Sequence, residues 1–415
     1  MFDDPVLVEL IEASLQCYPD MQIAEYRVNL AYSEALEAKS RLLPHIFLLG
    51  DIFRKKVSDF SSEHFGAPER FTEPTLMFNA FYEVDIWKKN RALFFAEMDH
   101  TFAAVADRAE AKLILSISVA QAYFNLQFHR KQLVILKERI ERKQEIYALL
   151  LQQFANKIIS EFRIYEVDSE VALLQDFAIQ LAAMIEIDEH LLQALVGNSC
   201  CAPLQMECLE PEATLCGAFP LPETLPCDLL ARRPDVIAKR WMVEASSYRV
   251  YAQRAKFYPS LDLLGYIGFQ SFRLMKFFTN KAFIFMGEAA GALPIFTAGK
   301  LSAELSQEEQ RFEIAIQEYN KSVLTAVKEV ENGMTELVAQ DDRRRQALRR
   351  LEDAQNLFRL TKSAFDSGTK NRLFLLNSVE DVLLHQDLVI KIDLARFEAA
   401  LSLIRAIGGG YFVSR

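Results

Sequence analysis

Apolar and polar residues alternate at every second position in two regions of the chain that prolines delimit. The alternation is clearest between Thr75 and Ile86, where one set of alternate residues is apolar and the other includes Asn79, Glu83 and Asp85. A period of two places the two sets on opposite faces of a β-strand. With the flanking prolines, the pattern predicts strands at residues 44–56, 74–87, 259–272 and 282–296.

Two longer regions are helical in character. No proline occurs from Thr75 to Ala202 or from Ile295 to Arg415, and both regions are rich in Ala, Leu, Glu, Gln and Lys. These residues favour helices, whereas proline breaks them. We therefore predict long helices at 88–155 and 300–367, each about 100 Å long. A turn separates each of them from a shorter helix, at 161–197 and 372–407.

The two halves of the chain resemble each other. Residues Tyr18–Gly50 align without a gap on Arg233–Gly265, and in both copies a Pro-Asp pair precedes another proline by 25 residues. This self-similarity indicates a tandem duplication. We expect a first repeat at 1–199, an inter-repeat linker at 200–230 and a second repeat at 231–415. Each repeat would hold a short helix, two strands, a long helix and a shorter helix.

The predicted strands are long enough for a barrel in an outer membrane, where about 9–11 tilted residues cross the hydrocarbon layer. Four strands are too few to close a barrel, and an open sheet in lipid would leave backbone groups without hydrogen bonds. Several chains must therefore contribute to one barrel. A homotrimer with twelve strands is the simplest closed arrangement, although the sequence also permits a dimer. The expected fold class is mainly α with a β-barrel part.

Composition excludes disorder and nucleic-acid binding. The chain is 51% hydrophobic, which is too apolar for a disordered protein. Its formal net charge is -10, its pI is about 5.3, and Lys and Arg are interleaved with Asp and Glu, so there is no basic stripe for a phosphate backbone. The longest uncharged stretch near the middle, Leu113–Phe128, has 16 residues and includes Gln and Asn. We therefore predict no transmembrane helix.

Five of the six cysteines lie in the linker, and only Cys17 lies elsewhere. The linker cysteines are Cys200, Cys201, Cys208, Cys216 and Cys227. Close CxxC pairs, which zinc sites usually contain, are missing, so we favour disulfides or free thiols over a metal. The chain opens with an acidic segment rather than a basic and then apolar one. We expect that a signal peptide and a lipid-acceptor cysteine are not present in this sequence, because Cys17 lies inside a helical segment.

Motifs of enzyme chemistry are missing. The six histidines form no HExxH or HxxxH arrangement, and the glycines at 408–410 are not followed by the Lys-Ser or Lys-Thr of a phosphate loop. We therefore predict no catalytic residue, no cofactor and no metal site.

Several segments are similar to the outer-membrane factor family, the TolC and OprM type. The resemblance covers nearly the whole chain and rests on these segments: FDDPVLVELIEASLQCYPDMQIA (Phe2–Ala24), YEVDIWKKNR (Tyr82–Arg91), LPCDLLARRPDVIAKR (Leu225–Arg240), FYPSLDLLG (Phe257–Gly265) and LIRAIGGGY (Leu403–Tyr411). It implies long antiparallel helical hairpins that form a periplasmic tunnel, below a trimeric 12-stranded barrel in the outer membrane.

The resemblance also implies a non-enzymatic exit duct of a tripartite efflux system. Small molecules such as drugs would reach it from an inner-membrane resistance-nodulation-division pump through a periplasmic adaptor, also called a membrane fusion protein. Type I protein secretion and metal-ion efflux remain alternative roles for such a duct. A soluble helical scaffold or adaptor is the alternative from a different class, since long amphipathic helices alone would suffice for it.

The helix-to-helix turns depart from the family pattern, which has a glycine, a small polar residue and then a pair of acids that narrow the periplasmic mouth. In the second repeat Phe374 and Asn377 stand where the acids would be, and in the first repeat Arg163 is a base instead. Three copies of Phe374 could form an apolar gate that closes by dewetting, or the ring could simply pack between helices. The candidates for the constriction and the adaptor contact are Asn156, Lys157, Ser160, Arg163, Gly368, Thr369, Asn371, Phe374 and Asn377.

Four acidic residues at strand positions are candidates for the lumen of the barrel: Glu83, Asp85, Asp262 and Glu288. Together they would favour cationic or neutral cargo. The alternative is that they only make the lumen wall polar, as lumen walls generally are.

Overall fold

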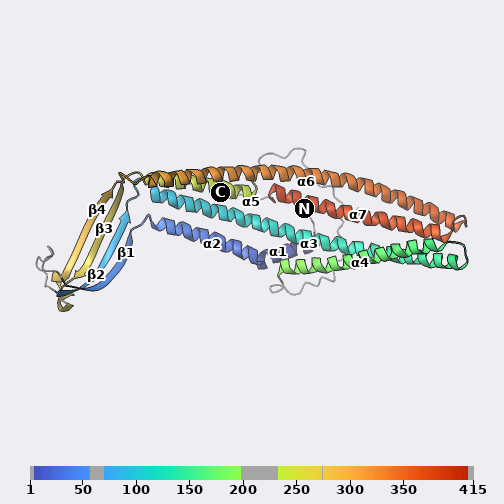
Figure 1. Ribbon diagram of the computed structural model, residues 1–415, viewed down its shortest axis with the longest axis horizontal. Helices are drawn as coiled ribbons and strands as arrows, with labels where there is room; N and C mark the ends of the chain where they lie inside the picture. Colours follow the sequence, from blue (N-terminus) through green and yellow to red (C-terminus); the bar gives the residue numbers. More distant parts are fainter. Residues whose placement is uncertain (1–3, 57–69, 198–231, 273, 410–415) are drawn as a thin grey trace. The chain divides into compact units, whose positions relative to one another are not determined.

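The computed structural model describes residues 4–56, 70–197, 232–272 and 274–409 (Figure 1). The linker cysteines of residues 200–227 lie outside these ranges. The main elements in chain order are α1 (Pro5–Cys17), α2 (Pro19–Ser40), β1 (His45–Lys56), β2 (Arg70–Glu83), α3 (Lys89–Ala155), α4 (Glu161–Val196), α5 (Pro234–Ala255), β3 (Ser260–Gln270), β4 (Phe283–Ala292), α6 (Lys300–Asp366) and α7 (Arg372–Ile407). Two short 3-10 helices, η4 (Leu274–Lys276) and η5 (Asn280–Ala282), lie between β3 and β4.

Corresponding helices in the two halves of the chain have equal lengths. Helices α2 and α5 each have 22 residues, α3 and α6 each have 67, and α4 and α7 each have 36. Helix α1 precedes the single short helix that the sequence predicts for the first half. Asp4 precedes it as the N-cap, and its Oδ1 accepts a hydrogen bond of 3.0 Å from the backbone N–H of Val6.

The four strands form one antiparallel sheet in the order β1-β2-β3-β4 (Figure 1). Residues opposite each other on neighbouring strands share a face. Starting from Phe78, this register joins Leu48 on β1, Ile267 on β3 and Phe285 on β4 into one row across the sheet. The alternation predicted from the sequence therefore continues across all four strands.

One face of the sheet carries only apolar residues and glycine over its central part. Its members are Ile46, Leu48, Gly50, Ile52, Pro74, Leu76, Phe78, Ala80, Tyr82, Leu261, Leu263, Gly265, Ile267, Phe269, Phe283, Phe285, Gly287, Ala289 and Gly291. Large side chains on it are exposed, with Ile46 at 70% and Phe285 at 74% of full accessibility. An exposed apolar surface of this kind marks contact with lipid or with another protein.

Strand β2 differs from its predicted range, 74–87, at both ends. It begins at Arg70 and includes Pro74, which has no N–H to donate. The proline is tolerated because pairing with β3 starts only at Thr75, opposite Gln270, so Pro74 lies outside that ladder. It ends at Glu83, because the chain then turns into α3. Strand β4 ends at Ala292 rather than at 296, ahead of Pro294.

The described residues divide into two compact units, and each unit draws on both halves of the sequence. The first consists of Met1–Ala24, Asp107–Val236 and Val323–Arg415, and the second of Glu25–Ala106 and Ile237–Ser322. In the first unit, Leu10, Phe124, Leu192 and Phe397 form the centre of an apolar core from α1, α3, α4 and α7. The rings of Phe124 and Phe397 stack at 4.7 Å between centroids.

The second unit holds the sheet and the parts of α2, α3, α5 and α6 within its ranges. Small side chains line its helix contacts, as shown by the buried Ala35, Ala96 and Ala245. Where strands meet helices, the Trp87 ring stacks on Tyr258 at 4.7 Å, and Trp87 Nε1 donates a 2.8 Å hydrogen bond to the Pro259 carbonyl. These contacts fix the end of β2 against the start of β3.

Candidate functional site: the helical tips and the polar sheet face

The turn between α3 and α4 is a left-handed helix stop centred on Lys157. The residue has φ 59°, and its N–H donates to the Phe154 carbonyl at 2.8 Å. The next N–H, of Ile158, donates to the Gln153 carbonyl at 2.9 Å. This pair of bonds is the one that usually surrounds a glycine at a helix C-terminus. Lys157 therefore adopts a backbone conformation that costs a residue with a side chain about 1–2 kcal/mol.

The turn between α6 and α7 has the same hydrogen bonds around Gly368. Its φ is 72°, its N–H donates to the Phe365 carbonyl at 2.9 Å, and the Thr369 N–H donates to the Ala364 carbonyl at 2.9 Å. Asn371 then caps α7, because its side chain accepts from the Phe374 N–H at 3.0 Å. The first turn is thus built like the second although it has no glycine.

Phe374 is not packed into the core at the α7 tip. Its side chain is 48% exposed, and Lys370 Nζ lies 4.2 Å from the centroid of its ring. This distance is well within the range of a cation–π contact. Lys370 lies in the turn before α7, so the four-residue spacing of a helix does not predict this contact, which the conformation of the turn sets. Asn377 lies one turn further along the helix and is exposed.

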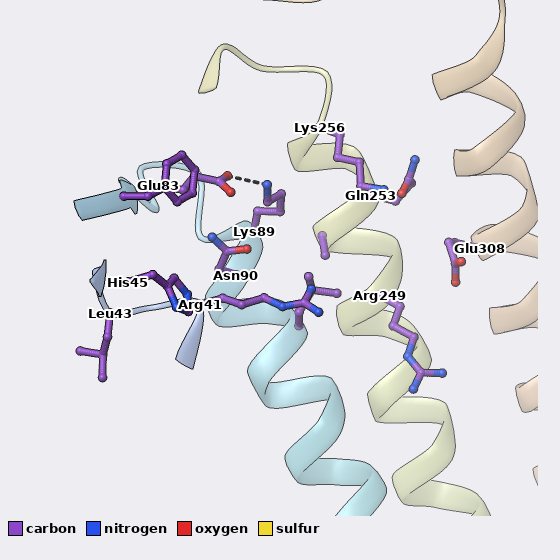
Figure 2. Close-up of a pocket in the computed structure, with 13 residues that line it drawn as sticks. Arg41, Leu43, His45, Glu83, Lys89, Asn90, Arg249, Gln253, Lys256 and Glu308 are labelled. Atoms are coloured by element: carbon purple, nitrogen blue, oxygen red, sulfur yellow. Dashed lines mark ion pairs between the residues drawn. The ribbon is translucent and has the colours of Figure 1, made fainter. Parts of the chain in front are cut away.

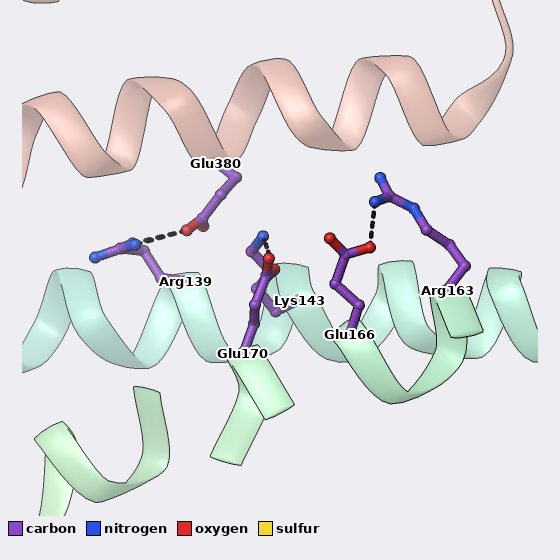
Figure 3. A network of polar contacts seen from close by, with 6 residues as sticks. All are labelled: Arg139, Lys143, Arg163, Glu166, Glu170 and Glu380. Atoms are coloured by element: carbon purple, nitrogen blue, oxygen red, sulfur yellow. Dashed lines mark hydrogen bonds and ion pairs between the residues drawn. The ribbon is translucent and has the colours of Figure 1, made fainter. Parts of the chain in front are cut away.

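The α4 side of the tip is polar and exposed. Asn156 and Ser160 are exposed, and Ser160 occupies the N-cap position of α4 without a side-chain capping bond. Arg163 forms an ion pair with Glu166 one turn further along the helix (Figure 3). The base that replaces an acid of the family pattern is therefore paired within its own helix.

Away from the turns, further along the helices, ion pairs join α3 to α7 and to α4 (Figure 3). Glu380 of α7 accepts hydrogen bonds of 2.9 and 2.8 Å from Nε and Nη2 of Arg139 on α3. Lys143 Nζ of α3 lies 2.6 Å from Glu170 on α4. Burial raises the pKa of Glu380 above its ordinary value, an effect that outweighs the opposing influence of Arg139. No sequence pattern indicates this pair, because its partners are 241 residues apart.

Three of the four acids proposed for the lumen lie on the face of the sheet opposite the apolar one; this face is called the polar face below, and it carries apolar residues as well. Glu83 and Asp262 face each other across β2 and β3, and Glu288 pairs in register with Leu264, which shares that face with Asp262. Glu83 also forms an ion pair with Lys89. Asp85 lies beyond the end of β2 instead.

The carboxylate of Asp85 holds the first turn of α3. Its two oxygens accept hydrogen bonds of 2.9 Å each from the backbone N–H groups of Asn90 and Arg91. An acid at a helix N-terminus accepts hydrogen bonds from N–H groups that have no partner within the helix. Its negative charge also interacts favourably with the positive end of the helix dipole. The structure thus gives Asp85 a helix-capping contact rather than a strand position.

A cavity of about 540 Å³ lies in the second unit, where the strands meet the helices; Figure 2 shows the residues that line it. Arg41, His45, Lys256 and the Glu83–Lys89 ion pair line it. Apolar residues such as Leu43 and Phe81 line it as well, and it lies at the end of the strands that carries the stacked aromatic rings.

Arg233, one residue of the family-like segment LPCDLLARRPDVIAKR, is buried in the first unit and joins three elements. The Arg233 guanidinium binds Asp235 at 2.8 Å, Glu329 of α6 at 2.8 Å and the Ala406 carbonyl of α7 at 3.0 Å. Gly408, with φ 86°, ends α7 against Arg233, and a Cβ on it would lie 3.1 Å from the Arg233 Cα. One arginine therefore ties the start of α5 to α6 and α7.

Among the helices of the described residues, none contains a window apolar and long enough to cross a membrane. The profile of the family described as "Outer membrane efflux protein" matches residues 10–198 and 225–409. Multidrug resistance outer membrane protein MdtP of Escherichia coli O6:H1 is 30% identical over 424 residues, which cover 99% of this chain and 85% of that protein.

Solved structures of outer membrane proteins are similar to this chain over nearly its whole length. The outer membrane protein VceC of Vibrio cholerae is 26% identical with a TM-score of 0.85, covering 99% of this chain and 98% of that one. The CmeC outer membrane channel of Campylobacter jejuni is 21% identical with a TM-score of 0.85, covering 100% and 88%, and shows the same fold. Channels of this family form trimers and work with adaptor and pump partners. The chain belongs to the outer membrane efflux protein family: it is an efflux channel rather than an enzyme, lying in the outer membrane and extending into the periplasm.

Proposed function

We propose that three copies of this chain form the exit duct of a tripartite multidrug efflux system. In this proposal a resistance-nodulation-division pump of the inner membrane and a periplasmic adaptor deliver small toxic molecules to it. The name of MdtP as a multidrug resistance protein supports this class of cargo. The energy would come from the pump, and the duct would provide a water-filled path.

The sheet carries the proposal of a trimer. Within the described residues, β1 and β4 each have a partner strand on one side only, and the face they share is apolar and exposed. In lipid, unpaired strand edges are costly, so the edges of neighbouring copies must pair. Three sheets of four strands would close a barrel of twelve.

The polar face of the same sheet would then line the lumen. Glu83, Asp262 and Glu288 lie on that face, and they would favour cationic or neutral cargo. Asp85 is not part of this proposal, because its carboxylate caps α3.

The turns at 156–160 and 367–371 would form the periplasmic mouth and the adaptor contact. The half-exposed ring of Phe374 supports an apolar constriction, with Lys370 above it adding positive charge. Replacing Phe374 with Ala should raise single-channel conductance in planar bilayers. Phe162→Ala, on the exposed start of α4, is the matched control, and equal effects of the two variants would contradict a gate at Phe374.

We also propose the two-repeat organisation, with repeats at 1–199 and 231–415. The equal lengths of α3 and α6 and of α4 and α7 support it. So do the matching turns around Lys157 and Gly368.

A charge on each face of the sheet tests the trimeric barrel. Ile267 belongs to the apolar face and Asn79 to the polar one. A charge on a lipid-facing strand position costs about 2–4 kcal/mol at the bilayer centre, whereas a lumen position tolerates it. Ile267→Arg should abolish the heat-modifiable trimer seen by gel electrophoresis of outer membranes, and Asn79→Arg should retain it. Loss of the trimer in both variants, or in neither, would refute the assignment of the faces.

Deletion of the gene tests the cargo. Cells without it should become sensitive to dyes, detergents and antibiotics, and the adaptor should co-purify with the wild-type channel. Sensitivity to metals alone would favour metal-ion efflux, and loss of a secreted protein alone would favour type I secretion. Either result would overturn the multidrug proposal.

A further inference from the structure

Three potential metal ligands converge in the second unit, away from the sheet acids and the helical tips. They are Glu34 of α2 and Glu97 and His100 of α3, and one ligand atom from each lies within 4.8 Å of the others. Glu97 and His100 are three residues apart, so the helix brings both to one face. Glu34 reaches the same point from the neighbouring helix.

The surroundings of His100 and Glu97 favour a bound ion, because His100 lacks a hydrogen-bond partner and Glu97 is held in place by one. His100 Nδ1 is buried and has no hydrogen-bond partner among the described residues. A buried imidazole nitrogen without a hydrogen-bond partner is unfavourable, and a bound ion or an ordered water would supply the missing partner. Glu97 Oε1 accepts a 3.1 Å hydrogen bond from Arg249 of α5, which orients the carboxylate and leaves Oε2 outside that bond. Charged partners of this kind orient metal-binding carboxylates.

We propose that Glu34, Glu97 and His100 bind one divalent transition-metal ion of the Zn²⁺ type. One imidazole and two carboxylates suit zinc, and three protein ligands leave a coordination position for water. The set has no thiolate or thioether, so it does not suit Cu(I). With Arg249 beside it, the site keeps a net charge of about -1, which favours a divalent cation.

The ion would fasten α2 to α3. The two glutamates repel each other without it, and a shared cation turns that repulsion into a cross-link between the helices. The site is structural in this proposal, since its ligands come from the helices rather than from the polar face of the sheet. It is independent of the cargo and of the trimer proposal.

The test is a Zn²⁺ titration of the purified full-length chain in detergent by isothermal calorimetry. The protein is first stripped with a chelator, and its cysteines are alkylated so that thiols of the 200–227 segment cannot bind the ion. We expect saturable binding of one Zn²⁺ per chain and a rise in the thermal unfolding midpoint on adding the metal. Mg²⁺ should give neither effect, because it disfavours imidazole ligands.

Single substitutions identify the ligands. His100→Gln and Glu34→Gln should each lower the affinity at least tenfold and abolish the thermal shift. His190→Gln, at an exposed position on α4, should behave like the wild type. Glu34 is exposed, so its replacement leaves packing intact, and an unchanged helical circular dichroism signal verifies this. Zn²⁺ binding that survives in both His100→Gln and Glu34→Gln, or that never saturates, would overturn the proposal.

Discussion

Removal of the Arg139 side chain should strongly destabilise the first unit. Arg139 gives two hydrogen bonds to one oxygen of Glu380, whose side chain is only 9% exposed. The other oxygen, Oε2, is buried and has no partner among the described residues. Arg139→Ala would therefore leave a buried carboxylate without any hydrogen-bond donor. Breaking a buried pair in this way costs about 3–5 kcal/mol.

The exposed pair of Arg163 and Glu166 provides the matched control. Both pairs involve an arginine near the tips, but the side chains of Arg163 and Glu166 are 55% and 38% exposed. An exposed pair one helical turn apart contributes about 0.3–0.5 kcal/mol. Arg163→Ala should therefore have nearly the stability of the wild type.

Denaturant unfolding, followed by circular dichroism at fixed protein and detergent concentrations, measures both variants. The cost of Arg139→Ala should shrink towards acidic pH, because protonation of Glu380 removes the unpaired charge. Joint replacement of Arg139 by Met and Glu380 by Leu should restore most of the stability, since apolar side chains need no partner. If Arg139→Ala lowers the free energy of unfolding at pH 8 by no more than Arg163→Ala does, the buried pair does not hold α3 to α7 as the geometry indicates.

Three further predictions concern single residues. Lys157→Gly should stabilise the first turn by about 0.5–1 kcal/mol in the same unfolding assay, because glycine adopts the positive φ without strain. Gly368→Ala should destabilise the second turn for the same reason. A loss of stability in Lys157→Gly would contradict this account. Gly268→Ala should reduce the yield of folded protein in outer membranes, because its Cβ would lie 2.2 Å from the Leu76 carbonyl oxygen; a normal yield would show that the strands shift apart easily. Glu380→Gln should flatten the dependence of stability on pH. The raised pKa means that the folded state binds the proton more tightly, so wild-type stability falls as pH rises from about 4.5 towards the folded pKa, and an equal slope in the variant would refute this.

The local elements were accessible from the sequence because their signals are local. Prolines and helix-forming residues predicted the bounds of the long helices to within one residue, at 89–155 and 300–366 against the expected 88–155 and 300–367. The period of two and the flanking prolines likewise identified the four strands of the described residues, and the register of the sheet assigns Phe78 to the expected apolar face. The family resemblance added the channel function, which periodicity alone does not supply.

The tertiary structure alone decided how individual polar side chains and turn residues are used. Asp85 continues the alternation of β2 in the sequence, yet the turn into α3 directs its carboxylate to backbone N–H groups. Lys157 takes the left-handed conformation because the packed helices on both sides require a turn there, whatever residue occupies it. Arg139 and Glu380 carry no shared pattern, since their pairing depends on how α3 and α7 pack. Sequence periodicity specifies which side of an element is apolar, whereas the partner of a buried charge depends on packing between elements that are far apart along the chain.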